Sequence, residues 1–82
     1  MHARSLADLP ANSSGMVLRF NLSDEDSIRI RTLGICPGMT VEVVQNGDPL
    51  ILASAGTRIG ISRRIAAHVM IEDEPVAAGA AL

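Results

Sequence analysis

The sequence predicts a small, mainly β domain in which about five short antiparallel strands form a strongly bent sheet that closes on itself. One helix is inserted after the first strand, and one short helical turn precedes the last. Three observations support this prediction. Apolar and polar residues alternate in several short stretches, as in strands with one buried face. Tight-turn sequences separate these stretches. The only aromatic residue is Phe20, so the core must be aliphatic, and β-branched residues favour strands.

The first strand is predicted at residues 16–22, MVLRFNL, after a loop-forming run at residues 10–15. Alternation places Val17 and Arg19 on one face. Met16, Leu18, Phe20 and Leu22 fall on the other, and we expect Phe20 to face the core. Leu6 and Leu9 are an apolar feature ahead of the loop, without a strand pattern of their own.

A helix is predicted from Ser23 to about residue 33. Ser23 is a good N-cap, and the carboxylates at residues 24–26 suit the first turn, where the helix dipole favours negative charge. Gly34 is placed to end the helix with a positive φ, and Pro37 prevents it from resuming. We expect apolar cover from this helix, supplied by Ile28, Ile30 and Leu33.

The rest of the chain predicts two hairpins and a closing strand. Alternating residues at 40–44 and the stretch at 50–54 flank a tight turn, Asn46-Gly47-Asp48-Pro49. Ala55-Gly56 turns again into residues 57–62. A short helical turn follows at residues 63–66, and the last strand, at residues 68–72, points Val69 and Ile71 inward. We assign residues 1–74 to one domain and residues 75–82 to a flexible tail.

Composition excludes several classes of function. Seven arginines and no lysine oppose nine acidic residues, for a formal charge of −2, so no global positive field favours nucleic acid. A phosphate-binding P-loop needs a lysine. No apolar run approaches the roughly 18 residues that span a bilayer, so direct membrane insertion is not expected. The first twenty residues lack the unbroken apolar stretch of a secretory signal, and a cytoplasmic location is therefore expected.

Thiol and metal chemistry have little support in the residue pattern. A catalytic cysteine needs a neighbouring base, and Cys36 is accompanied only by His2, near the terminus, and His68, on the outward alternation of the last strand. No CxxC, HxxxH or HExxH spacing is present. We interpret Cys36 as a small apolar residue under a turn, and residues 24–26 as a helix start. We therefore expect no enzymatic activity, no cofactor and no metal site.

From residues 6 to 72 the sequence resembles the FeoA domain of bacterial ferrous-iron transport, known as ferrous iron transport protein A. The resemblance rests on Leu6, Leu9, Gly15-x-Val17 and Gly56, on residues 31–38 (RTLGICPG) with 41–43 (VEV), on residues 47–49 (GDP), and on residues 61–66 (ISRRIA) with Val69 and Ile71.

The resemblance implies an SH3-like barrel and a small cytoplasmic accessory protein. Its implied partner is the FeoB-type ferrous-iron permease, a membrane protein with its own GTPase domain. Residues 34, 37–38 and 47–49 (Gly34, Pro37, Gly38, Gly47, Asp48 and Pro49) are then structural turns. As hypothetical partner contacts we name Arg58, Arg63, Arg64 and Met70.

Three alternatives remain open at this point. The chain could be an iron-binding metallochaperone or sensor that uses carboxylates with Cys36 or His68. It could be a regulatory module like the FeoA domains appended to iron-dependent repressors. Exposed strand edges could also allow self-association.

Overall fold

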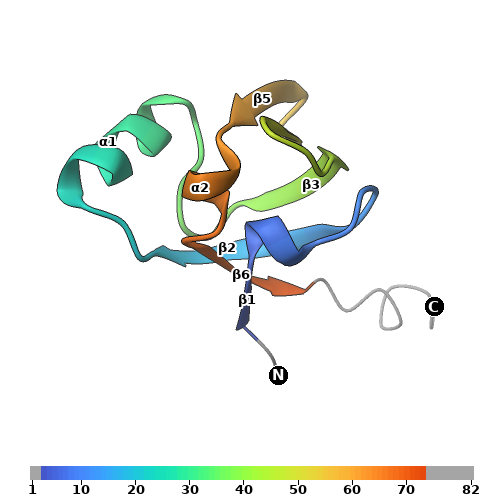
Figure 1. Cartoon of the computed structure of the whole chain (residues 1–82), viewed down its shortest axis with the longest axis horizontal. Helices are drawn as coiled ribbons and strands as arrows, with labels where there is room; N and C mark the ends of the chain where they lie inside the picture. Colours follow the sequence, from blue (N-terminus) through green and yellow to red (C-terminus); the bar gives the residue numbers. More distant parts are fainter. Residues whose placement is uncertain (1–2, 74–82) are drawn as a thin grey trace.

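The computed structural model describes residues 3–73, which fold as a bent antiparallel sheet (Figure 1). The sheet has six strands in the order β1-β6-β2-β3-β4-β5. The elements in chain order are β1 (Ala3–Ser5), a 3-10 turn η1 (Leu6–Asp8), β2 (Ser14–Phe20), α1 (Asp24–Thr32), β3 (Thr40–Gln45), β4 (Leu50–Ser54), β5 (Thr57–Ile61), α2 (Arg63–Ala66) and β6 (Val69–Asp73).

The sheet has one strand more than the sequence predicts, and backbone pairing does not close it. The extra strand is β1, which pairs with β6. It is only three residues long, too short for alternation to reveal. Within residues 3–73, β1 and β5 are the two edges of the sheet. The bend brings the strands around the core, but the predicted closure is not made by backbone hydrogen bonds.

The core is aliphatic, as predicted. Leu6, Ile35, Val43 and Leu52 are each 0% exposed, and they come from η1, the loop before β3, and strands β3 and β4. The other buried apolar residues are Ala7, Leu9, Val17, Ile30, Val41, Leu50, Ile61, Ala66, Val69 and Ile71. The predicted inward positions of Val69 and Ile71 are thus confirmed.

The buried face predicted for β2 was wrong for Met16 and Leu18, although Phe20 does pack against the core. Val17 is 1% exposed, whereas Met16 and Leu18 are half-buried. Between Val17 and Arg19 the pairing of β2 with β6 shifts register. Such a bulge interrupts the two-residue alternation, and Phe20 beyond it packs partly buried against the core.

Helix α1 begins where the sequence predicts but covers less of the core than expected. The Ser23 hydroxyl accepts a hydrogen bond from the Asp26 N–H at 3.2 Å, and Gly34 follows the helix with φ +104°. Only Ile30 is buried in this helix. The prediction of apolar cover from Ile28 and Leu33 was wrong, because their exposed fractions are 64% and 46%.

Two tight turns shape the strands that follow. The β3–β4 connection contains a cis peptide bond between Asp48 and Pro49. The β4–β5 connection is the dipeptide Ala55-Gly56, with φ +52° and +80°. Positive φ at both central residues identifies a type I′ turn, whose twist matches that of the strands it joins.

The expected C-terminal tail, residues 75–82, and the domain boundary at residue 74 lie outside the described residues. None of the helices found in residues 3–73 is long and apolar enough to cross a membrane.

A close approach at Gly15 generates a stability prediction. This buried residue lies opposite Val41 of β3 and Asp73 of β6. A Cβ placed there would lie 2.8 Å from Ile71 Cδ1 and 3.0 Å from the Glu72 carbonyl oxygen. We predict that Gly15→Ala lowers the free energy of unfolding by about 1–3 kcal/mol, because the sheet must shift to accept the methyl group.

Urea denaturation followed by circular dichroism measures this loss. Gly47→Ala is the matched control, because a Cβ at Gly47 meets its nearest atoms at 3.6 and 3.7 Å. It should stay within about 0.5 kcal/mol of wild type. Equal stability of the two variants would contradict the crowding at Gly15.

Candidate interaction site

Side chains from the β3–β4 turn and α2 bind the backbone of η1, in an arrangement that we call the polar clamp (Asn46, Asp48 and Arg63 with the carbonyls of Ala7 and Leu9). Asn46 Nδ2 donates to Leu9 O at 2.6 Å and to Ala7 O at 3.1 Å. Arg63 Nη2 donates to Ala7 O at 3.3 Å, and Arg63 Nη1 donates to Asn46 Oδ1. Two helical turns and a hairpin are thereby joined.

The clamp also orients α2. Asp48 Oδ1 accepts a hydrogen bond from the backbone N–H of Arg63 at 3.2 Å, and the Ser62 hydroxyl accepts one from the Ile65 N–H at 3.1 Å. Both acceptors satisfy N–H groups that the first turn of a helix leaves without intrahelical partners. The Gly-Asp-Pro turn and the Ser62 cap therefore fix the start of α2.

Beside the clamp, α1, α2 and the end of β5 enclose a groove of about 320 Å³, the α1–α2 groove. Its floor is apolar: Ile30 is 2% and Ile61 5% exposed. Leu33, at 46% exposed, is the most accessible apolar residue of the lining. The full lining is Asp26, Arg29, Ile30, Leu33, Gly60, Ile61, Ser62, Arg64 and Ile65.

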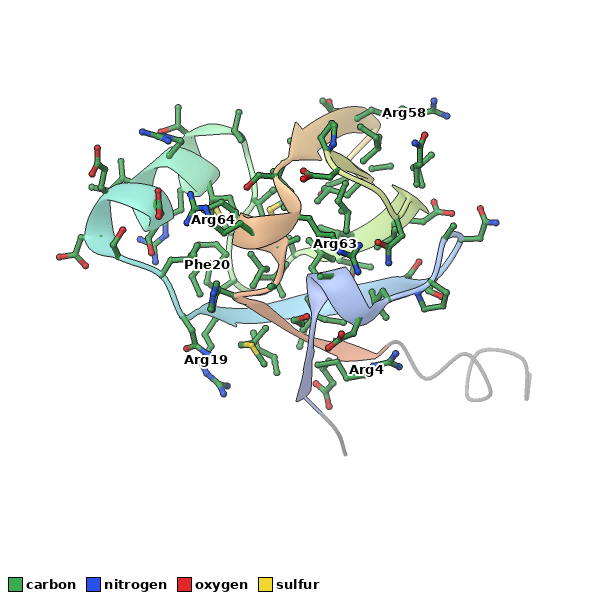
Figure 2. The ribbon with its side chains drawn as sticks, in the orientation of Figure 1. Arg4, Arg19, Phe20, Arg58, Arg63 and Arg64 are labelled. Carbon is green, nitrogen blue, oxygen red and sulfur yellow. The ribbon has the colours of Figure 1, made fainter. Side chains whose placement is uncertain are left out.

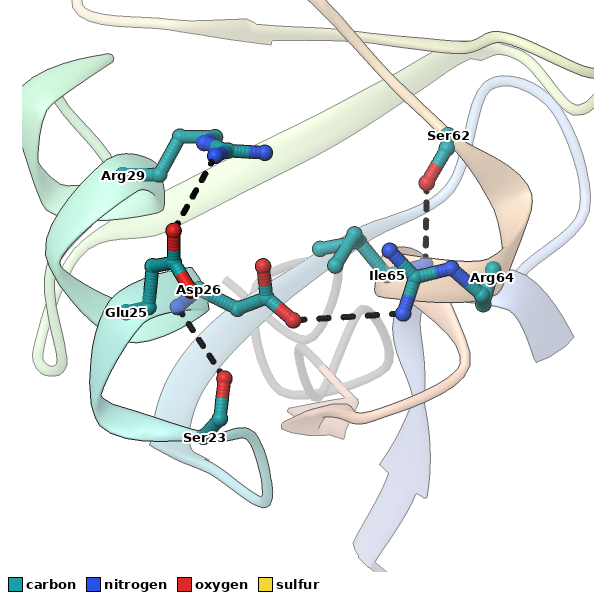
Figure 3. Close-up of polar contacts among 7 residues, drawn as sticks. All are labelled: Ser23, Glu25, Asp26, Arg29, Ser62, Arg64 and Ile65. Atoms are coloured by element: carbon teal, nitrogen blue, oxygen red, sulfur yellow. Dashed lines mark hydrogen bonds and ion pairs between the residues drawn. The ribbon is translucent and has the colours of Figure 1, made fainter.

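Charged side chains stand over the groove from both helices (Figure 3). Arg64 Nη1 lies 3.9 Å from Asp26 Oδ2, across the groove, and Arg29 Nη2 lies 3.8 Å from Glu25 Oε2 on the same helix. The two arginine side chains are 68% and 69% exposed. Long, exposed ion pairs contribute little, up to about 1 kcal/mol. Both guanidinium groups can therefore exchange their carboxylate partners for a carboxylate on a bound molecule.

The structure does not gather the four predicted contact residues into one patch, and Figure 2 shows Arg58 apart from Arg63 and Arg64. Arg63 and Arg64 are neighbours on α2, but the Arg63 guanidinium is bound within the polar clamp. Arg58 is exposed near the β4–β5 turn, at the end of β5 away from α2. Met70 is half-buried on β6, opposite Ser5 of β1 and Arg19 of β2. Only Arg64 of these four lines the groove.

Sequence reasoning missed the groove because its lining comes from three separate segments. The sequence places Leu33 on the predicted helix and Ile65 in the predicted helical turn, 32 positions later, and gives no sign that the two meet. Asn46 was seen only as a turn residue. Its amide donates to the carbonyls of Leu9 and Ala7, which lie 37 and 39 positions earlier in the chain. No local sequence pattern signals such a contact.

The described residues offer little that could act as a metal centre or a thiol site. They contain no group of three or more His, Cys, Asp and Glu side chains placed to hold a metal ion. Cys36 is half-buried in the loop after α1, and His68 is exposed just before β6. What the surface does offer is a groove with an apolar floor and an arginine on each side, which suits recognition of another molecule.

Comparison with known proteins identifies relatives of this chain. The family model of the FeoA domain matches residues 4–73. A crystal structure of an iron uptake regulatory protein (FeoA) superposes with a TM-score of 0.83 at 22% identity, covering 90% of this chain and 100% of that one. A zinc complex of FeoA from Stenotrophomonas maltophilia, described as an SH3 domain protein, has a TM-score of 0.70 and 29% identity over 83% of this chain and 88% of that one.

The same fold occurs within larger proteins. IdeR from T. acidophilum superposes with a TM-score of 0.81 at 20% identity, over 90% of this chain but only 35% of that one. No curated protein matched the sequence. The SH3-like fold expected from the sequence is confirmed by these structures.

The polar clamp generates a second stability prediction. Asn46→Ala removes both hydrogen bonds to the η1 backbone and the acceptor of Arg63. We expect it to lower the free energy of unfolding by about 1–3 kcal/mol, because two backbone carbonyls and the Arg63 guanidinium each lose a partner. Urea denaturation again provides the measurement. Gln45→Ala, an exposed neighbour, should change stability by less than about 0.5 kcal/mol; equal losses for the two variants would contradict the clamp.

Proposed function

The chain belongs to the FeoA family, and on that premise we propose that it is a small accessory protein of bacterial ferrous-iron transport that acts on the FeoB-type permease as a protein–protein interaction module. The match over residues 4–73 carries this proposal, since it spans every helix and strand that the structure describes, except for the first residue of β1. The module itself catalyses no reaction, and the GTPase belongs to its partner.

The α1–α2 groove supports an interaction role. Contiguous apolar surface rimmed by polar residues marks sites that meet other molecules, and the 46%-exposed Leu33 lines the groove together with Ile30 and Ile61 and with charged residues. Arginine is the charged residue most enriched at the centres of protein interfaces. We propose Arg58, Arg64 and Met70 as permease contacts, with Arg63 acting through the clamp. A protein that meets a permease's GTPase domain works in the cytoplasm, where we place this chain.

A second candidate is a regulatory or metal-sensing module. It is favoured by the fold shared with part of T. acidophilum IdeR, and by the relative from S. maltophilia that was solved with zinc. Anaerobic titration with ferrous iron separates this candidate from the first, because a pure interaction module binds no stoichiometric iron.

The proposal predicts that a ferrous-iron permease is retained by the tagged chain from detergent extract. Arg58→Ala with Arg64→Ala should reduce that retention about tenfold, since each change removes a charged donor from the contact surface. Arg19→Ala is the matched control; it removes an exposed arginine from β2. In the same strain, deletion of the chain should impair anaerobic ferrous-iron uptake.

Two results would contradict this account. If the wild-type chain retains no permease and its deletion leaves ferrous-iron uptake normal, the proposed function is wrong. If permease is retained equally by the double variant and by Arg19→Ala, the function stands and the named contacts are wrong.

A further inference from the structure

The outer edge of β5 carries unpaired backbone groups at known positions. The type I′ turn at Ala55-Gly56 makes Ser54 and Thr57 the first pair of the β4–β5 ladder, which in a two-residue hairpin is a hydrogen-bonded pair. Antiparallel pairs alternate between hydrogen-bonded and non-hydrogen-bonded. Arg58 and Gly60 are therefore non-hydrogen-bonded residues in this ladder, and their N–H and C=O groups point away from β4, toward the open edge.

This open edge runs into the α1–α2 groove. Gly60 and Ile61 line the groove together with Arg29 and Ile30 of α1 and with Leu33 at its C-cap, so an open strand edge and a helix face the same space. Gly60 is exposed, and the Cβ that it lacks would lie 3.3 Å from Ile51 Cδ1, on the face of the sheet and not over its open edge. An extended chain placed here could pair with Gly60 and direct every second side chain toward the apolar floor.

The charge of the groove selects the kind of chain that fits. Its lining contains two arginines and one aspartate. Both arginine side chains are more than two-thirds exposed, whereas the Asp26 side chain is 21% exposed. Glu25, whose side chain is 85% exposed and lies 3.8 Å from Arg29 Nη2, stands beside the groove but outside its lining. The lining itself carries one more positive than negative charge, and guanidinium groups bind carboxylates with paired donors. A segment with carboxylates is favoured over a basic one.

We propose that β5 binds an extended, acidic segment of a partner protein, which adds to the open edge as a further strand. Its backbone pairs with Arg58 and Gly60, an apolar side chain packs on Ile30 and Leu33, and a carboxylate is held between Arg29 and Arg64. This mode is β-strand addition, in which backbone bonds supply affinity and alternate side chains supply specificity. The inference rests on the proposed function, for which it names the chemistry of the partner segment.

The test presents the whole chain with a displayed library of random decapeptides that have free C-termini. We expect enrichment of peptides in which acidic and apolar residues alternate. When a selected peptide is synthesised and added to the isotopically labelled protein, the amide signals of Arg58 and Gly60 should shift and the Gly60 amide hydrogen should exchange more slowly. Arg29→Gln combined with Arg64→Gln should weaken binding about tenfold, while Arg19→Gln should leave it unchanged.

Four outcomes would overturn the inference: no enrichment, enrichment of basic peptides, selected peptides that perturb β1 in place of β5, or dimerisation of the chain through β5 that excludes them. Because the wild-type amide signals report binding directly, the inference stays testable even if a glutamine variant folds poorly. The result of the peptide experiment can also be distinguished from the result of the permease experiment. Peptide binding without permease retention leaves the β5 site intact and removes only the permease as its partner.

Discussion

The hydrogen bonds from Asn46 and Arg63 to the backbone of η1 hold together a sheet that backbone pairing leaves open. One edge strand, β1, runs directly into η1, and the other, β5, leads through Ser62 into α2. The polar clamp joins those two turns across the β3–β4 hairpin. The core of this domain is almost wholly aliphatic, and apolar packing is non-directional. The directional hydrogen bonds of the clamp therefore fix the relative positions of η1, α2 and the hairpin, which packing alone would not fix.

This mode of closure has a functional consequence. Closing a sheet by a continuous ladder removes its edges, whereas a side-chain clamp leaves β5 with unpaired groups along the α1–α2 groove. Closure by the polar clamp thus stabilises the fold and also leaves the edge of β5 exposed for a partner. It also explains why sequence segments that lie apart, Gly47-Asp48-Pro49 and Ser62-Arg63-Arg64, occur together in this chain: Asp48 accepts from the Arg63 N–H. The two segments are one structural unit.

The sequence predicted the fold well where the signals were local. The Ser23 helix cap, the Ala55-Gly56 turn and the inward positions of Val69 and Ile71 all follow from the residues next to them in the sequence. The sequence did not predict β1, because three residues are too few to show a period, or the buried face of β2, because a bulge resets the alternation after Val17. The groove was missed for a different reason. Leu33 and Arg64 lie 31 positions apart in the sequence, and only tertiary packing brings them to the same site.

A double-mutant cycle on Asn46 and Arg63 tests the central claim most directly. Asn46→Ala, Arg63→Ala and the double variant are compared with wild type by urea denaturation at one pH and salt concentration. The clamp predicts that the two substitutions are not additive, with a coupling free energy of about 1 kcal/mol or more. Either substitution alone already breaks the hydrogen bond between Asn46 and Arg63, so the second cannot remove it again. Additive losses, within about 0.3 kcal/mol, would show that Asn46 and Arg63 contribute independently and would contradict the account.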